Sequence, residues 1–326
     1  MVPRALRFAL KLLIAAGLVS LATRGVVWAD VQDAIRRVAW PWFTLCLGLV
    51  VVDRTLMAWR WVALLRAVEP LPRQPLWPLI RIFFVSSFVS AFLPGTGSLG
   101  GDAVRALSLS RRGVATPQAV GSVAVDRLLG TVSVLLMAVV GLVLAGRLID
   151  SRWLLWATLA AVAGVAGSMV LLFDSRMLAA IVRWAGAVHF PTVERLSQKF
   201  LLAIGQYGSH RGVLAAVLAA SVGVQLLRSA QAWCLGLAIG LTIGGVWYFA
   251  LIPFAVIAFL LPASVSGLGA GTASFVPLFA LAAVPAADAV ALSLLFWLLG
   301  VLGNLPGGLL VAGGQWPSGT RPGSAP

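Results

Sequence analysis

A few polar side chains within long apolar runs are the candidates for binding or catalysis. An ionisable group at such depth costs about 2.5–3.5 kcal/mol on insertion scales, so it is expected to pair or to face a polar interior. Arginines there would hold an anionic head group, and nearby carboxylates would balance the remaining charge. This predicts a binding pocket that contains Asp53, Asp102, Arg105, Asp126, Arg127, Gln225, Arg228, Gln231 and Asn304.

Spacing places several of these residues on shared helix faces. Asp102 and Arg105 are three positions apart at the start of a helix, where an acid also complements the helix dipole. Asp53 and Arg60 are seven positions apart and share a face of an earlier helix, with Arg54 beside them. These spacings favour pairing between acid and base within the apolar interior.

Arg228 is the strongest candidate for binding, because it lies near the middle of its apolar run between Gln225 and Gln231. The three residues form a polar stripe at three-residue spacing. The alternative is that the arginines form internal salt bridges or extend to the interfaces. That alternative is favoured for Arg60 and Arg105, which lie near one end of their helices.

Two breaks rich in proline and small residues interrupt apolar helices, "FLPGTGSLGG" at 92–101 and "LLPASVSGLG" at 260–269. Irregular backbone at membrane depth is tolerated only where protein or a water-filled cavity covers it. The breaks therefore predict a polar cavity, with close packing of helices through small residues as the alternative. The tip residues are Pro94, Gly95, Gly97, Ser98, Gly100, Gly101, Pro262, Ser264, Ser266, Gly267 and Gly269.

The composition excludes a soluble domain, because 60% of the 326 residues are hydrophobic and only 10% are charged. The net charge of +14 comes from short basic clusters between apolar runs. Such clusters are typical of the positive-inside bias of membrane proteins rather than of nucleic-acid binding. We therefore predict an all-α polytopic membrane protein.

Six apolar segments are long enough to cross a bilayer core, which needs about 20 residues. They are residues 7–24, 41–63, 120–146, 153–173, 213–240 and 286–311. Two further segments, 77–93 and 247–261, end early at a proline and are too short. Each is expected to turn and leave on the side it entered, as a re-entrant hairpin near 77–110 and near 247–284.

The two hairpins are expected to enter from opposite sides, as an inverted repeat. With the N-terminus cytoplasmic, this topology places most lysines and arginines inside, whereas simple spans would place most of them outside. The first helix is expected to stay uncleaved, because its "VWAD" lacks a signal-peptidase pattern. One membrane domain therefore covers 1–312, with interfacial cytoplasmic helices at 174–211 and a disordered cytoplasmic tail at 313–326.

The sequence offers no pattern for catalysis. It has no metal-ligand spacing, no G-x-S-x-G elbow and no paired acids of the D-x-D kind, and the two cysteines lie within apolar segments. We therefore expect no catalytic residues, no metal and no cofactor, and a protein that is not an enzyme.

The stretches "LPGTGSLGGDAVRALSLSRRG", "VAVDRLLG" and "LLPASVSGLGAGTASFVPLF" resemble the lysylphosphatidylglycerol synthase transmembrane region, also called the flippase-like domain. The resemblance covers about 10–312. It implies a bacterial inner-membrane protein that moves amphipathic lipids between leaflets. Because the separate soluble aminoacyltransferase domain of bifunctional members is not found in this sequence, it implies translocation without synthesis.

One position departs from that pattern. Similar proteins carry Arg-Glu soon after the second Gly-x-Gly, where this chain has Gly271 and Thr272. A less charged or sterol-like lipid such as a hopanoid therefore stands beside an anionic or modified lipid as the implied substrate.

The resulting hypothesis is a lipid translocase with both termini cytoplasmic, whose partners are membrane lipids and not nucleic acid. A lipid-biosynthetic enzyme is a candidate protein partner. The rival hypotheses are a non-transporting scaffold or accessory subunit of a lipid or glycan pathway, and a carrier of small solutes.

Overall fold

A computed structural model describes residues 26–68, 74–92, 97–145, 205–260, 264–265 and 268–316, with a few isolated positions outside these ranges. The predicted spans at 7–24 and 153–173, the first helix with its uncleaved N-terminus, and most of the predicted interfacial segment 174–211 lie outside the described residues. So does most of the predicted tail, from 317 on.

Four described helices are long and apolar enough to cross a membrane. Each has 27 to 30 residues, which corresponds to about 40–45 Å. They correspond to four of the predicted spans, with ends that differ from the predicted ones by at most five residues. The four helices are α3 (Trp40–Val68), α6 (Thr116–Ala145), α10 (Arg211–Ala238) and α13 (Ala286–Ala312).

The first broken region folds into two antiparallel helices, α4 (Leu76–Phe92) and α5 (Gly97–Ser110). Arg105 donates to the Ser86 hydroxyl, and Gly101 lies against the backbone of Ser86 and the side chain of Ser90. With 17 residues, α4 reaches about 25 Å, less than the roughly 30 Å core. The prediction of a short helix that turns back is confirmed.

The second broken region repeats this arrangement with α11 (Gly245–Leu260) and α12 (Ala270–Ala280). The rings of Phe259 and Phe275 pack edge to face at 6.3 Å between centroids, and Tyr248 packs on Phe279 at 5.5 Å. The order of these ring pairs along the chain shows that α11 and α12 are antiparallel. The 16 residues of α11 also fall short of a bilayer core.

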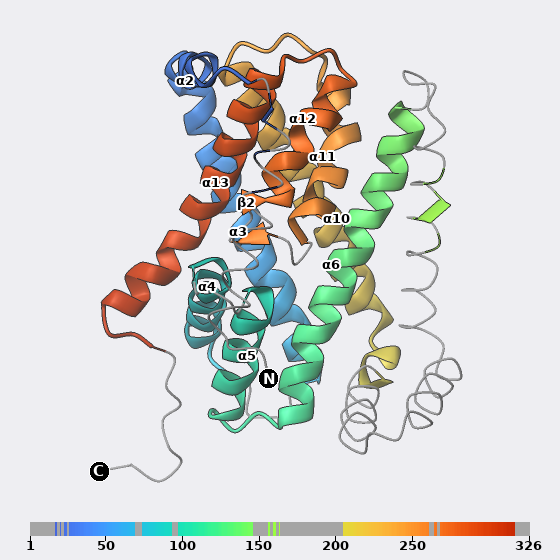
Figure 1. Ribbon diagram of the computed structural model, residues 1–326. Coiled ribbons are helices and arrows are strands. Elements are labelled where there is room, and N and C mark those ends of the chain that lie inside the picture. Colours follow the sequence, from blue (N-terminus) through green and yellow to red (C-terminus); the bar gives the residue numbers. More distant parts are fainter. Residues whose placement is uncertain are drawn as a thin grey trace.

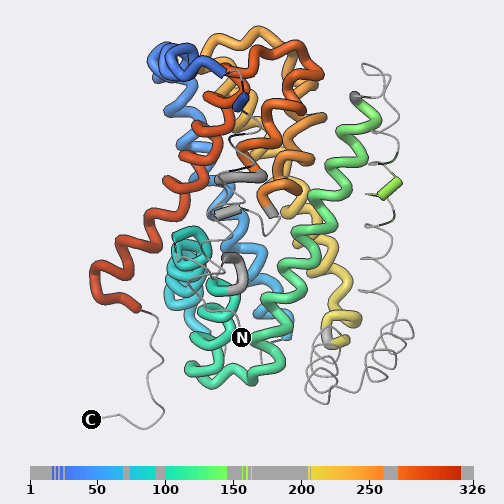
Figure 2. Tube along the Cα trace, viewed as in Figure 1, coloured from blue at the N-terminus to red at the C-terminus, as the bar shows by residue number. Residues whose placement is uncertain are grey.

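The two hairpins occupy opposite halves of the molecule (Figure 1). α4 and α5 lie below and α11 and α12 above, and the turn from α5 to α6 lies at the far end from α2. Strand β2 (Leu268–Gly269), at the turn of the second hairpin, lies between the two halves. The tube in Figure 2 shows the same order along the chain. This arrangement has the form of the predicted inverted repeat.

The tips differ from the prediction in two ways. Gly97, Ser98, Gly100 and Gly101 belong to the first turns of α5 and not to a loop. A Cβ on Gly101 would meet the Ser86 carbonyl, so this glycine serves close helix contact, which was the alternative considered for small residues. Of the other tip residues of the first break, Pro94 and Gly95 lie outside the described residues.

The second tip contains a short antiparallel strand pair, β1 (Ser264–Val265) with β2, which was not predicted. Ser264 pairs with Gly269, and Val265 pairs with Leu268. Backbone groups that leave a helix away from water need partners, and this ladder supplies them. Pro262, Ser266 and Gly267 lie outside the described residues.

Two short elements were also absent from the prediction. Helix α2 (Trp28–Arg36) is amphipathic and buries Val31 and Ala34 against the bundle. The 3-10 turn η1 (Gln206–Ser209) buries Tyr207, whose hydroxyl donates to the Leu64 carbonyl at 3.2 Å. Both are too short for hydropathy to reveal.

Helix α13 crosses α4 through glycines. A Cβ on Gly307 would fall against the Phe84 carbonyl and the Phe88 side chain, whereas Gly300 in the same helix has open space around it. The first hairpin therefore depends on a close backbone approach that only glycine at 307 permits.

We expect Gly307→Ala to lower the melting temperature, because the added methyl must push α13 away from α4 at a cost of about 1–3 kcal/mol. The matched control is Gly300→Ala, which should leave the melting temperature unchanged or slightly raised through helix propensity. Thermal unfolding of the detergent-purified chain checks this. Equal shifts for both variants would contradict the packing.

Candidate functional site

One deeply buried ionic group is a carboxylate shared by two arginines from different helices. Asp126 of α6 is 5% exposed. Its Oδ1 accepts from Arg60 Nη2 of α3 at 2.6 Å, and its Oδ2 lies 3.4 Å from Arg105 Nη1 of α5. Arg60 also donates to the Asp126 carbonyl at 3.2 Å. Gly130, one turn along α6, leaves room for the Arg60 guanidinium.

Arg105 is held on all sides by neighbours. Its Nε donates to Ser86 Oγ of α4 at 2.8 Å. Its guanidinium lies over the ring of Phe83 at 4.7 Å and over that of Trp61 at 5.4 Å. Cation–π contact and charge-assisted hydrogen bonds stabilise an arginine out of water. Arg105 therefore acts as an internal bridge, in agreement with the salt-bridge alternative.

A second ion pair lies beside this group but is open to the surface. Arg127 of α6 forms a bidentate pair with Asp102 of α5, with distances of 2.9 and 3.0 Å. The side chain of Arg127 is 43% exposed, and that of Asp102 is 17% exposed. Asp102 therefore pairs with the next helix and not with Arg105 on its own face.

A third ionic group lies near the middle of α3. Asp53 is 2% exposed, and its carboxylate lies 3.5 Å from Arg54 Nε and 3.7 Å from Arg228 Nε of α10. Its Oδ1 accepts no hydrogen bond within the described residues. Both arginines also reach Met57 Sδ, at 3.9 and 3.7 Å. Gly303 of α13 leaves space for the Arg54 guanidinium.

The predicted amides lie near these groups with different partners. Gln225 is buried and donates to Ser133 Oγ of α6 at 3.3 Å. Gln231 is buried, and its Nε2 donates no hydrogen bond within the described residues. Asn304 donates to the Gly300 carbonyl of its own helix at 2.8 Å, and its Oδ1 accepts none there.

Arginines outnumber carboxylates in this interior. Asp53 is shared by two arginines and Asp126 by two others, while Asp102 has one. Five guanidinium groups therefore face three carboxylates among these pairs. Because unpaired charge at such depth is costly, the surplus favours an anionic guest over a cationic one.

The nine predicted pocket residues thus divide between two levels of the bundle. Asp53 and Arg60, both on α3, belong to different groups, and seven residues of helix separate them by about 10 Å. Sequence reasoning did not place Arg54, Arg60 or Ser86 in the pocket. The one feature of the sequence that could have pointed to Ser86 is that it is one of two adjacent serines within the apolar run that forms α4.

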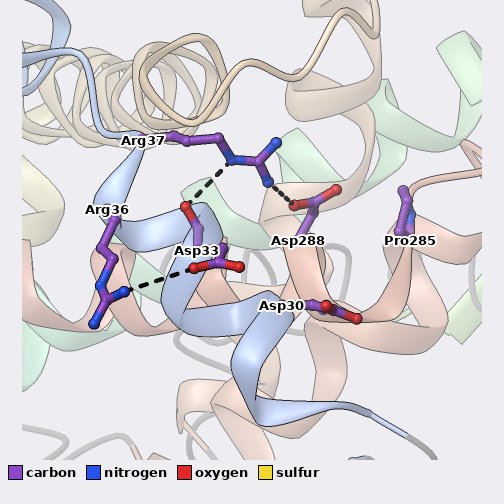
Figure 3. Close-up of a pocket in the computed structure, with 7 residues that line it drawn as sticks. Asp30, Asp33, Arg36, Arg37, Pro285 and Asp288 are labelled. Carbon is purple, nitrogen blue, oxygen red and sulfur yellow. Dashed lines mark hydrogen bonds and ion pairs between the residues drawn. The ribbon is translucent and has the colours of Figure 1, made fainter.

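A pocket of about 630 Å³ lies elsewhere, between α2 and the start of α13 (Figure 3). Both of its arginines have acidic partners: Arg37 lies 3.6 Å from Asp288 and donates to the Asp33 carbonyl at 3.2 Å. Arg36 lies 3.9 Å from Asp33. These exposed pairs contribute little energy and hold α2 on α13.

Gly271 and Thr272 stand where the family resemblance implies an Arg-Glu pair, and both are closely packed in this chain. A Cβ on Gly271 would fall against the Phe259 ring, and Thr272 is 7% exposed. A charged side chain at 271 therefore has no room in this packing. Within the described residues, no group of three or more His, Cys, Asp or Glu side chains could hold a metal ion.

We expect Asp126→Asn to lower stability by about 3–5 kcal/mol, because it leaves two buried arginines without a counter-charge. The isosteric change Asp102→Asn should cost about 1 kcal/mol or less, since its partner is largely exposed. Melting temperatures of the two variants in the same detergent check this. An equal loss in both would contradict the assignment of Asp126 as the shared buried anion.

Comparison with known proteins adds one finding. A family model described as the lysylphosphatidylglycerol synthase TM region matches residues 8–307. No curated protein matches the chain. The matched range includes every ionic group described above.

Proposed function

The chain belongs to the lysylphosphatidylglycerol synthase TM region family, a family of membrane proteins linked to lipid-related processes, and from this premise we propose that it is a translocase. It moves an amphipathic lipid with an anionic head group between the leaflets of the bacterial inner membrane, and it has no catalytic role. Both termini are cytoplasmic in this proposal.

One observation carries the proposal: the group around Asp53 has two arginines for one carboxylate near the middle of α3. Asp53 Oδ1, which faces Arg228 Nε, makes no hydrogen bond within the described residues, and neither does Arg54 Nε. A phosphate group would accept from both guanidinium groups and supply the missing negative charge. Arg228 and Arg54 keep some exposure, so a guest can reach them.

The route follows from the spacing of the ionic groups along α3. The head group enters past the exposed Arg127 and Asp102 pair and reaches the level of Asp53, about 10 Å further along the bundle. Its acyl chains stay in lipid. The Asp126 group stays closed, because Arg105 is held by two aromatic rings and Ser86, and Arg60 is held by the carboxylate and carbonyl of Asp126.

Proteoliposomes that contain a fluorescent phosphatidylglycerol test the proposal by the rate at which the probe becomes accessible to an external quencher. We expect Arg228→Ala to slow exchange at least about tenfold, the factor that corresponds to one lost charge-assisted hydrogen bond. The matched control is Arg36→Ala, which removes an exposed arginine on α2 and should leave the rate unchanged.

Two outcomes would overturn the proposal. Exchange by Arg228→Ala at the wild-type rate would remove Arg228 from the site. Wild-type vesicles that exchange neither an anionic lipid nor a labelled hopanoid faster than protein-free vesicles would favour the scaffold. Exchange of the hopanoid alone would reject the anionic head group and retain translocation, consistent with the packed Gly271.

A further inference from the structure

The two arginines of the Asp53 group meet at one sulfur atom. Arg54 Nη1 of α3 lies 3.9 Å from Met57 Sδ, and Arg228 Nη2 of α10 lies 3.7 Å from the same atom. Met57 is one turn along α3 from both Asp53 and Arg54, so the three side chains are neighbours on that helix. The sulfur atom therefore marks the point on which the two guanidinium groups converge.

The two helices that carry these residues are joined near both of their ends. The N–H of Ala39, just before α3, donates to the carbonyl of Ala238, the last residue of α10, at 2.8 Å. The hydroxyl of Tyr207, just before α10, donates to the carbonyl of Leu64 near the end of α3 at 3.2 Å. The helices are therefore antiparallel, and Met57 lies between the two joined ends. Because both backbones are held, the positions of the guanidinium groups depend on their side-chain partners.

These partners are weak within the described residues. Arg54 Nε lies 3.5 Å and Arg228 Nε lies 3.7 Å from the carboxylate of Asp53, and neither pair forms a hydrogen bond. The other partner of both arginines is a thioether sulfur, which is a weak acceptor. In the Asp126 group, by contrast, Arg60 Nη2 donates to a carboxylate oxygen at 2.6 Å. The two guanidinium groups of the Asp53 group are therefore held in place but keep donors for a stronger acceptor.

A methionine is well suited to hold these groups temporarily. Its side chain is unbranched and has three rotatable bonds, so the sulfur moves aside without a shift of the backbone. Met57 is half-buried, and the side chains of Arg54 and Arg228 are 17% and 24% exposed, so a guest can reach all three. An oxygen acceptor at position 57 would hold the arginines more strongly and compete with a guest, whereas an apolar side chain would leave them free.

We propose that Met57 is a positioning residue of the lipid site: its thioether keeps the two guanidinium groups together while the site is empty and yields them to the phosphate of the head group. The oxygens of a phosphate diverge, so one phosphate bridges two guanidinium groups that a single sulfur atom already reaches. The inference rests on the proposed function and adds the residue that sets the affinity of the site. That affinity depends on which acceptor position 57 offers.

The test compares two substitutions at position 57 that change the acceptor in opposite directions. The probe is a short-chain phosphatidylglycerol, titrated by calorimetry into the full chain in a non-ionic detergent. Met57→Gln introduces a carbonyl oxygen and should weaken binding at least about fivefold, because the head group must then replace a stronger hydrogen bond. Met57→Leu keeps nearly the same volume without an acceptor and should bind the probe at least as tightly as the wild type.

The matched control is Leu56→Gln, which introduces the same amide at the adjacent position of α3. Leu56 is half-buried like Met57, and its side chain lies toward Gly223 of α10. This variant should change the dissociation constant less than about twofold, because the new amide lies away from the two arginines. Melting temperatures close to that of the wild type in all variants separate recognition from folding. A diacylglycerol with the same acyl chains measures the binding that the chains alone provide.

Weaker binding by Met57→Leu would show that Met57 serves packing and would overturn the inference. So would unchanged binding by Met57→Gln, or equal weakening by Met57→Gln and Leu56→Gln. In each of these cases the wild type still binds the lipid, so the failure is separate from failure of the proposed function. A wild-type chain that binds phosphatidylglycerol no better than diacylglycerol would refute the anionic site itself, and this inference with it.

Discussion

The sharing of Asp126 between Arg60 and Arg105 is the interaction on which the structure depends most. It joins α3, α5 and α6 in the apolar interior, where each of these charges alone would be costly. Ser86 extends the network to α4. A short helix that turns back has no spanning length to hold it in place, so its position must come from such contacts, and the first hairpin is fixed by its side chains to the long helices around it.

The charges follow an order along the bundle. At the α2 end, Asp33 and Asp288 pair with one arginine each, whereas arginines exceed carboxylates among the described interior pairs. Among the described pairs, such an arrangement makes the electrostatic potential more positive in the interior than at the α2 end. An anionic head group would therefore be attracted to the interior.

Several features were predictable because they depend on local sequence. The length of the apolar runs identified α3, α6, α10 and α13. Pro94 and Pro262 marked the ends of the two short helices. The start of α5 at Gly97 was missed, since glycines typical of a loop are also what a helix needs where it touches Ser86. The strand pair at the second tip was missed because two residues per strand leave no periodic pattern.

Short stretches of sequence are enough to identify a membrane protein with ionisable residues in its apolar helices, because the length of a span and the cost of a charge in it are local properties. Which charges pair, by contrast, depends on how the helices pack. Asp102 and Arg105 lie on one helix face, yet each bonds to a residue of α6. A side chain in an apolar interior takes the partner with the best geometry, and helix packing rather than spacing along the chain determines which partner is within reach.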